Sequence, residues 1–338
     1  MQIVEVKQNW PADRLLFNWS VHNTCNYKCW YCFPGSNEGT YRWPDFDLAV
    51  KNFNHLINYY KTHLNKKFFE VHLLGGEPTL WPKLGKFIET IKKEHGNSVI
   101  ICMTTNGSRT LAWWKRYGQF FDKVLISVHP ETADEYHIAD VCDFLYDANV
   151  FVDATVLMDP NKWDRCIEII SGLKTSKRRW SIQTSQVIHD SITYTKEQHK
   201  YLKHYLKRWP NILWMLRTKK NHNYGNTITF KNGKTKKIRK NYLLINKANY
   251  FNGWECNVGI DNISVLASGR LSASCEQRLY GLDFDYNFYD PAFVDKFAPT
   301  LKTAICDRHG CFCEHEFNTS KREINNTKKV IHIHANRS

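Results

Sequence analysis

Three cysteines lie within one short stretch that decides the fold, and this stretch reads Cys25-Asn26-Tyr27-Lys28-Cys29-Trp30-Tyr31-Cys32. It follows an apolar run, Leu15–Val21, that predicts a β-strand. It precedes a Pro-Gly pair that indicates a turn. We therefore expect the cysteines on a loop at the carboxyl end of a strand, where three thiolates could hold a metal centre.

The sequence on either side of this loop alternates between two patterns. Short apolar or β-branched runs predict further strands at Phe69–Leu74, Val99–Thr104, Lys123–Ser127, Val150–Met158 and Trp180–Val187. Longer amphipathic stretches predict helices at Asp45–Leu64, Pro82–Glu94, Leu111–Tyr117, Glu131–Tyr146, Trp163–Thr175 and Thr195–Trp209. Repeated alternation predicts a parallel α/β sheet with crossover helices, whose active residues lie at the carboxyl ends of the strands.

The number and spacing of the three thiolates limit the metal centre. They do not complete a tetrahedral zinc site with four cysteine ligands, and His22 is the one other potential ligand nearby. On a four-iron cluster, three thiolates leave one iron open for a small ligand. The cysteines alone leave a zinc site with a distant fourth ligand as the alternative.

The C-x3-C-x2-C spacing, with aromatic Tyr31 before the last cysteine, resembles the signature of the radical S-adenosylmethionine (SAM) superfamily. The resemblance implies a partial (β/α)6 barrel in which Cys25, Cys29 and Cys32 hold a [4Fe–4S] cluster, and it implies that Tyr31 lies at the SAM site. In that family the open iron binds SAM, which is reductively cleaved to a 5′-deoxyadenosyl radical that abstracts hydrogen from a substrate. No motif identifies catalytic residues beyond this cofactor machinery.

Three further motifs follow the predicted strands in the order that the family requires. Gly75-Gly76-Glu77-Pro78 follows the second strand, where glycines allow close backbone approach and a carboxylate accepts hydrogen bonds from an ammonium. It resembles the motif that holds the SAM amino group. Asn106 resembles the family's T-N-G residue near SAM, and Ser127 the polar residue on the SAM ribose or carboxylate. His129 precedes a proline and could simply lead into the next helix.

Polar side chains also alternate along the last two predicted strands. Asp153 and Thr155 alternate with apolar residues on the fifth strand, and Gln183 and Gln186 lie on the sixth. In a barrel this polar face could point inward toward SAM or the substrate. A contact with a helix cap is the alternative.

A second cysteine group lies near the carboxyl end of the sequence. Its C-x12-G-x5-C start resembles a SPASM or twitch domain, an extension that holds auxiliary four-iron clusters, although the glycine spacing is one residue longer than usual. Five cysteines fit one auxiliary cluster, held by Cys256, Cys275 and two of Cys306, Cys311 and Cys313. A structural zinc site with four cysteine ligands is the alternative. The remaining cysteines, Cys102, Cys142 and Cys166, are expected to be small core residues.

The pattern changes after about residue 210. Ile228–Phe230 and Lys236–Ile238 flank an Asn-Gly turn and predict a β-hairpin with basic surroundings. We expect a partial barrel at 1–210, a basic hairpin and linker at 211–250, a twitch-like domain at 251–320 and a basic tail at 321–338.

The composition constrains location and partners. The chain has 338 residues, of which 42% are hydrophobic and 24% charged, as in ordinary globular proteins. It shows neither a membrane-length apolar run nor a secretory signal, so a cytoplasmic location is expected. Its 47 Lys and Arg against 33 Asp and Glu give a net charge of +14, which favours anionic partners.

The resemblance implies an external reductant such as flavodoxin or ferredoxin. It also favours a peptide or protein as the substrate, because family members with such extensions often modify peptides. Radical modification of a nucleic acid, a nucleotide or another small anionic metabolite is the alternative. A zinc-stabilised nucleic-acid-binding module is the alternative that involves no catalysis.

Overall fold

The computed structural model describes most of the chain, in ten segments. These are residues 2–9, 11–32, 35–176, 180–187, 191–205, 226–238, 242–272, 285–307, 310–311 and 319–324. Cys275, Cys313, the end of the helix expected to reach Trp209, and nearly all of the expected tail lie outside these segments.

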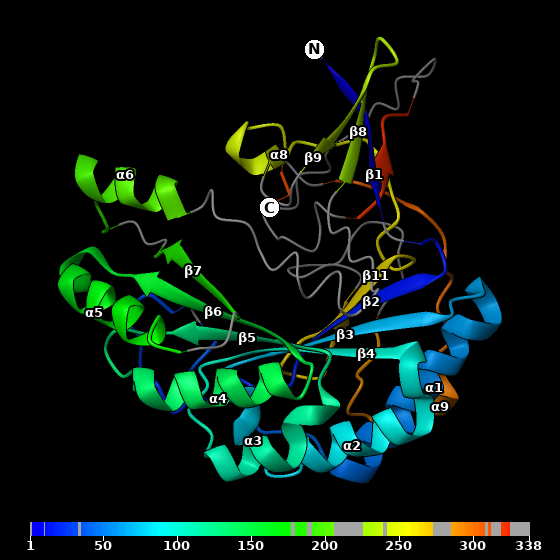
Figure 1. Ribbon diagram of the computed structural model, residues 1–338. Coiled ribbons are helices and arrows are strands. Elements are labelled where there is room, and N and C mark those ends of the chain that lie inside the picture. The colour runs from blue at the N-terminus through cyan, green and yellow to red at the C-terminus, as the bar shows by residue number, and fades with distance from the viewer. Residues whose placement is uncertain are drawn as a thin grey trace, which may run out of the picture.

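A large sheet in the order β12-β11-β2-β3-β4-β5-β6-β7 forms the centre of the molecule (Figure 1). All neighbours from β11 to β7 are parallel, and β12 is antiparallel to β11. The sheet is open, because β12 and β7 are its two edges. Its strands are β2 Arg14–Ser20, β3 Phe68–Leu74, β4 Val99–Thr105, β5 Lys123–Val128, β6 Phe151–Met158, β7 Ser181–Gln186, β11 Asn262–Val265 and β12 Leu271–Ser272.

The crossover helices cover one face of this sheet (Figure 1). They are α1 Phe46–Leu64, α2 Leu84–His95, α3 Leu111–Tyr117, α4 Glu135–Asp147 and α5 Trp163–Leu173, and α6 Lys196–Tyr205 follows β7. Short 3-10 turns lie at Pro78–Leu80, Gly96–Ser98, Gly118–Phe120 and Pro160–Lys162. Because this covering is one-sided, each strand has a helix-facing side, and we call the opposite side the inner face.

Alternation along β2 shows how the sequence assigns the two faces. Leu15, Phe17 and Trp19 belong to the hydrophobic core, where the Phe17 ring lies 5.7 Å from that of Phe53 in α1 and Trp19 lies 5.2 Å from Phe87 in α2. Truncating a buried aromatic residue in such a core destabilises a protein by about 3–5 kcal/mol. The intervening residues of β2 therefore belong to the inner face.

Side-chain caps mark the starts of helices α1 and α4. Asp45 accepts a hydrogen bond from the backbone N–H of Leu48 (3.0 Å), and Asp134 accepts bonds from those of Tyr136 and His137. Such caps satisfy amide groups that the first helical turn leaves unpaired. Helix α4 therefore begins at Glu135, four residues after Glu131, where the sequence predicted its start.

A second, antiparallel sheet lies toward the inner face of the first (Figure 1). Its order is β13-β10-β14-β1-β8-β9. Its strands are β1 Ile3–Gln8, β8 Asn226–Phe230, β9 Thr235–Ile238, β10 Glu255–Cys256, β13 Ala304–Ile305 and β14 Lys321–Arg322, with helices α8 Tyr242–Ile245 and α9 Phe293–Lys296 nearby in sequence. Residues from both ends of the chain thus share this sheet.

The parallel α/β architecture expected from the sequence is confirmed, and so is the hairpin, as β8 and β9. Strand β1 was not expected, nor was the addition of β11 beside β2 in the large sheet. The burial expected for Cys102, Cys142 and Cys166 is confirmed, since each is at most 1% exposed; Cys142 and Cys166 lie in the main hydrophobic cluster, and Cys102 lies beside Glu70. Within the described segments, no helix is both long enough and apolar enough to cross a membrane.

Candidate functional site

The cysteine loop begins directly beyond the carboxyl end of β2, as expected. Cys25, Cys29 and Cys32 are half-buried and lie close enough for their charges to influence one another. Burial raises the pKa of Cys25. It also raises the pKa of Cys29 to about 11, and the charges of Glu131 and the other two thiols add to this second increase. Protonated thiols of this kind become ligands when a metal displaces their protons.

The spacing of the three thiols bears on whether they hold a cluster or a single zinc ion, whereas Cys29, His129 and Glu131 form a set whose ligand atoms lie close enough together for one ion. In a tetrahedral zinc site, sulfurs about 2.3 Å from the metal lie about 3.8 Å apart. Ligand atoms that share one metal ion lie within about 4.8 Å of one another. Among the described residues, the three sulfurs of Cys25, Cys29 and Cys32 do not form such a set. Three thiols that lie too far apart to bind one ion fit a larger metal cluster better.

The Gly75-Gly76 pair packs against the backbone that leads into the cysteine loop. A Cβ on Gly75 would come 2.3 Å from the carbonyl oxygen of His22, and one on Gly76 would come 2.2 Å from that of Thr24. The Gly76 N–H donates to His22 O (2.9 Å), and the Glu77 N–H donates to Thr24 O (2.8 Å). The glycines are needed because only an absent side chain permits this approach.

Replacing Gly76 with alanine is expected to destabilise the protein and to weaken iron binding, since the clash is with backbone that cannot rotate away. The effect should be on the order of 2–3 kcal/mol in urea denaturation. Gly118→Ala is the matched control, because a Cβ there meets the side chains of Leu145 and Phe144 at 3.0 Å, and these can adjust. Equal stability of the two variants would contradict this role of Gly76.

Glu77 connects the loops that follow β3 and β4. Its carboxylate is 1% exposed. Oε1 accepts bonds from Thr79 N (3.1 Å), Thr79 Oγ1 (2.6 Å) and Thr105 Oγ1 (2.7 Å), and Oε2 accepts one from Asn106 N (2.7 Å). Burial raises the pKa of Glu77 despite these bonds. Each oxygen of an ionised carboxylate has about two acceptor positions, so Oε2, which accepts one bond, retains room for one more donor.

Asn106 connects this arrangement to the cysteine loop. Its Nδ2 donates to Asn26 Oδ1 (2.9 Å), and its Oδ1 accepts from the backbone N–H of Ser108 (3.0 Å). Asn26 in turn donates to the Ser108 hydroxyl (3.0 Å). The structure thus brings Cys25, Glu77 and Asn106 together at one end of the sheet. Pro78 begins the short 3-10 turn after Glu77.

Ser127 and His129 lie at the end of β5. Ser127 is half-buried on the inner face, because its neighbours Ile126 and Val128 belong to the core. His129 Nδ1 lies 3.1 Å from Cys29 Sγ and 3.1 Å from the Tyr31 hydroxyl, and the His129 and Tyr31 rings stack. Burial lowers the pKa of His129 to about 4, so the ring is neutral at neutral pH.

The contact of His129 with the cysteine loop was not anticipated, and neither was that of Glu131, whose Oε2 accepts a hydrogen bond from the Tyr31 hydroxyl (3.0 Å). One signal could have found both residues. They directly follow a strand of a parallel sheet, at the edge where functional side chains gather.

Charged and polar side chains line the inner face below these motifs. Asp153 accepts hydrogen bonds from Thr155 Oγ1 (3.3 Å) and from Gln183 on the neighbouring strand. Burial raises the pKa of Asp153 to about 6, although the charge of Lys123 opposes this. The polar residues of β6 therefore lie on the inner face, where Asp153 contacts β7.

A compact ion network surrounds Glu70 on the same face. The carboxylate lies 2.5 Å from Arg14 Nη2 and 3.0 Å from His72 Nε2, and Cys102 Sγ lies 3.7 Å away. Burial alone would raise the pKa of Glu70, but the hydrogen bond from His72 and the charges of His72, Arg14 and Lys123 together hold it at about 2. Glu70, His72 and Cys102 could also contact one metal ion, but the cations beside them oppose this.

The depressed pKa of Glu70 predicts acid sensitivity. A folded pKa of about 2 against about 4.3 in the unfolded chain stabilises the protein above about pH 4.3, and this contribution disappears as pH falls toward 2. It amounts to on the order of 3 kcal/mol. Urea midpoints at about pH 6 and about pH 3 should differ less in Glu70→Gln than in the parent protein. An unchanged difference would show that Glu70 does not carry this effect.

The described cysteines of the second group lie in or near the second sheet, where Cys256 packs in the larger hydrophobic cluster and Cys306 and Cys311 pack in the smaller one. Cys256 lies in β10 and pairs with Ala304 of β13 on one side and with Lys321 of β14 on the other. Cys306 follows β13, and its N–H donates to Trp254 O (2.7 Å). Lys321 Nζ lies 3.7 Å from Cys311 Sγ. The three described cysteines of this group are each at most 7% exposed.

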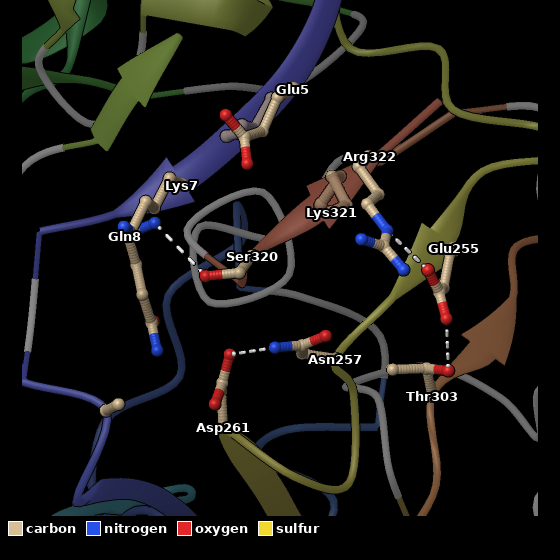
Figure 2. Close-up of a pocket in the computed structure, with 12 residues that line it drawn as sticks. Glu5, Lys7, Gln8, Glu255, Asn257, Asp261, Thr303, Ser320, Lys321 and Arg322 are labelled. Carbon is tan, nitrogen blue, oxygen red and sulfur yellow. Dashed lines mark hydrogen bonds and ion pairs between the residues drawn. The ribbon is translucent and has the colours of Figure 1, made fainter. Parts of the chain in front are cut away.

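A cavity of about 410 Å³ lies beside the second sheet, between β1, β10 and β14 (Figure 2). It adjoins the amino-terminal ends of the strands of the large sheet, through Ala12 and Asp261, and so lies opposite the cysteine loop. Several of its polar groups pair with each other, as Arg322 with Glu255 (2.6 Å) and Asn257 with Asp261 (3.0 Å). These two pairs account for four of the polar side chains that line the cavity.

Comparison with known proteins identifies the segment that carries the motifs. Residues 19–175 match the family model of the Radical SAM superfamily. A GTP 3′,8-cyclase of Haemophilus ducreyi is 30% identical over 102 residues, or 29% of this chain and 28% of that protein. A GTP 3′,8-cyclase of Sulfurimonas denitrificans is 29% identical over 170 residues, or 47% of this chain and 51% of that protein. The chain thus spans about half or less of these relatives.

The solved structure described as "Native anSMEcpe with bound AdoMet" is similar over 84% of this chain and 81% of that chain, with a TM-score of 0.50 and 15% identity. At this identity the likeness shows a shared fold. The family segment contains the cysteine loop, Gly75 to Pro78, Asn106 and Ser127.

Proposed function

We propose that this chain, which contains a radical SAM domain at residues 19–175, reductively cleaves SAM and uses the resulting radical to abstract hydrogen from a substrate. The observation that carries this proposal is the convergence of the cysteine loop, Glu77 and Asn106 on one end of the parallel sheet. When bound to Cys25, Cys29 and Cys32, a [4Fe–4S] cluster would supply the electron and an open iron for SAM.

The chain's own residues would orient SAM. The free acceptor position of Glu77 would receive a hydrogen bond from the SAM ammonium, and the bonds from Thr79, Thr105 and Asn106 hold that carboxylate in place. Ser127 on the inner face would contact the ribose or carboxylate, and Tyr31 would border the site. His129 would hold the Cys29 side of the loop.

We also propose an auxiliary cluster on the second cysteine group, with Cys256, Cys275 and two of Cys306, Cys311 and Cys313 as ligands. The position of Cys306 directly after β13, the strand that pairs with Cys256 in β10, supports it. It would relay electrons or anchor the substrate. The electrons would come from a reductant such as flavodoxin or ferredoxin.

Two substrate classes fit a domain of this kind. Peptide or protein modification is favoured by the twitch-like cysteine spacing. A nucleotide or another small anionic metabolite is favoured by the name that the curated relatives share and by the net charge of +14. A steep fall of substrate or RNA affinity with salt would indicate a nucleic acid.

The proposed activity is tested by anaerobic reconstitution with iron and sulfide, followed by dithionite and SAM. We expect about four irons per chain for one cluster or about eight for two, and formation of 5′-deoxyadenosine. Zinc without iron, and intact SAM, would instead support the zinc-stabilised binding module.

A further inference from the structure

Asn18 lies on the inner face of the large sheet, in β2, which is the third strand from the β12 edge. It lies on β2 between the core residues Phe17 and Trp19, and therefore points to the opposite side. The strand register places it beside Ser264 of β11 on one flank and His72 of β3 on the other. The same row continues through Cys102 to Lys123.

Asn18 and Ser264 differ from the other polar residues of this row because their side chains are buried without hydrogen-bond partners. Each residue is 4% exposed. Neither the Nδ2 nor the Oδ1 of Asn18 has a partner among the described residues, and the hydroxyl of Ser264 has none there either. His72, in contrast, contacts Glu70. Most buried polar side-chain atoms in proteins are paired, so two adjacent unpaired groups need a physical reason.

The fold itself does not require an asparagine at position 18. An apolar residue of similar size would fill the position of Asn18 without leaving an amide unpaired. Asn52 shows the structural use of a buried amide in this same protein, since its Nδ2 donates to the backbone oxygens of Phe288 (2.8 Å) and Asp290 (3.3 Å), although its Oδ1 has no partner among the described residues. Within the described part of the chain, Asn18 has no such partner.

We propose that Asn18, assisted by the Ser264 hydroxyl, recognises an amide or lactam group of the substrate on the inner face. The side-chain amide of Asn18 has a hydrogen-bond donor beside an acceptor. It therefore pairs with a ligand group that has an acceptor beside a donor, as an amide or a lactam does. The assignment rests on the proposed function, because the inner face lies below the carboxyl-end motifs that would hold SAM. A nucleobase lactam and an amino-acid carboxamide both carry this chemistry.

The test compares Asn18→Leu with Asn52→Leu in the reconstituted protein. Asn18→Leu should melt at or above the temperature of the parent, because it removes an unpaired buried amide, whereas Asn52→Leu should melt at a lower temperature. A fall in melting temperature for Asn18→Leu as large as that for Asn52→Leu would overturn the proposal, since it would show that Asn18 has a structural partner or a bridging water.

Ligand chemistry is tested with GTP and with L-glutamine at millimolar concentration. At least one should raise the melting temperature of the parent, and Asn18→Leu should lose that rise. A response to GTP alone would indicate a nucleobase lactam, and a response to glutamine alone a carboxamide. No response of the parent, or a response that Asn18→Leu retains, would overturn the assignment. Melting is measured without SAM or reductant, so a failure here is distinct from a failure to cleave SAM.

Discussion

Replacing Cys29 with alanine is expected to remove about four irons per chain and to reduce 5′-deoxyadenosine formation to background. Cys29 is the central thiol of the loop, and two remaining thiolates do not hold a four-iron cluster that needs three. Iron and sulfide analysis after anaerobic reconstitution, together with chromatography of the nucleoside product, measures both effects. If two clusters are present in the parent, the variant should retain about four irons.

Cys142→Ala provides the matched control. Cys142 is fully buried in α4 among core residues, so its loss should change stability slightly and leave the iron content intact. A Cys29→Ala protein that kept the full iron content and formed 5′-deoxyadenosine would remove the cysteine loop from the cofactor site.

Glu77→Gln should lower both stability and SAM affinity. Glutamine has one acceptor oxygen, so its amide N–H would face a backbone or hydroxyl donor that now bonds to the carboxylate. We expect a loss of about 2–4 kcal/mol in the free energy of unfolding, because hydrogen bonds to a buried charged group are replaced by a donor conflict. The lost interaction with the SAM ammonium should reduce affinity at least about tenfold.

Urea denaturation and equilibrium binding of SAM separate these two effects. Glu89→Gln is the control, because Glu89 lies on the surface of α2 in an i,i+4 pair with Lys93. It should match the parent in both assays. Unchanged SAM affinity in Glu77→Gln would contradict the role proposed for this carboxylate, even if the variant were less stable.

Local sequence pattern predicted strands β2 to β7 of the large sheet and the helices between them well, because short-range periodicity determines these elements. The helix predicted at Leu111–Tyr117 has the same ends as α3, and the strand predicted at Val99–Thr104 ends one residue before β4 does. Helix α4 was expected too early, because Pro130 marked the start of a turn and Asp134 provides the actual cap. The four motifs lie at strand ends as predicted.

Long-range pairing could not be predicted in the same way. Strand β11 joins β2 across about 250 residues of sequence, and β1 pairs with β8 and β14. Short strands of this kind have little periodicity, and their pairing is decided by tertiary contacts. The missing partners of Asn18 also depend on three-dimensional packing, so its chemistry is visible only once β2, β3 and β11 are side by side.

The most direct test of the central claim is electron paramagnetic resonance of the anaerobically reconstituted and reduced protein, recorded with and without SAM. A cluster held by Cys25, Cys29 and Cys32 leaves one iron open, so SAM should bind that iron and change the signal. The change should be absent in Cys29→Ala and present in Cys142→Ala. A four-iron signal that SAM leaves unaltered, or a protein that takes up zinc in place of iron, would contradict the account.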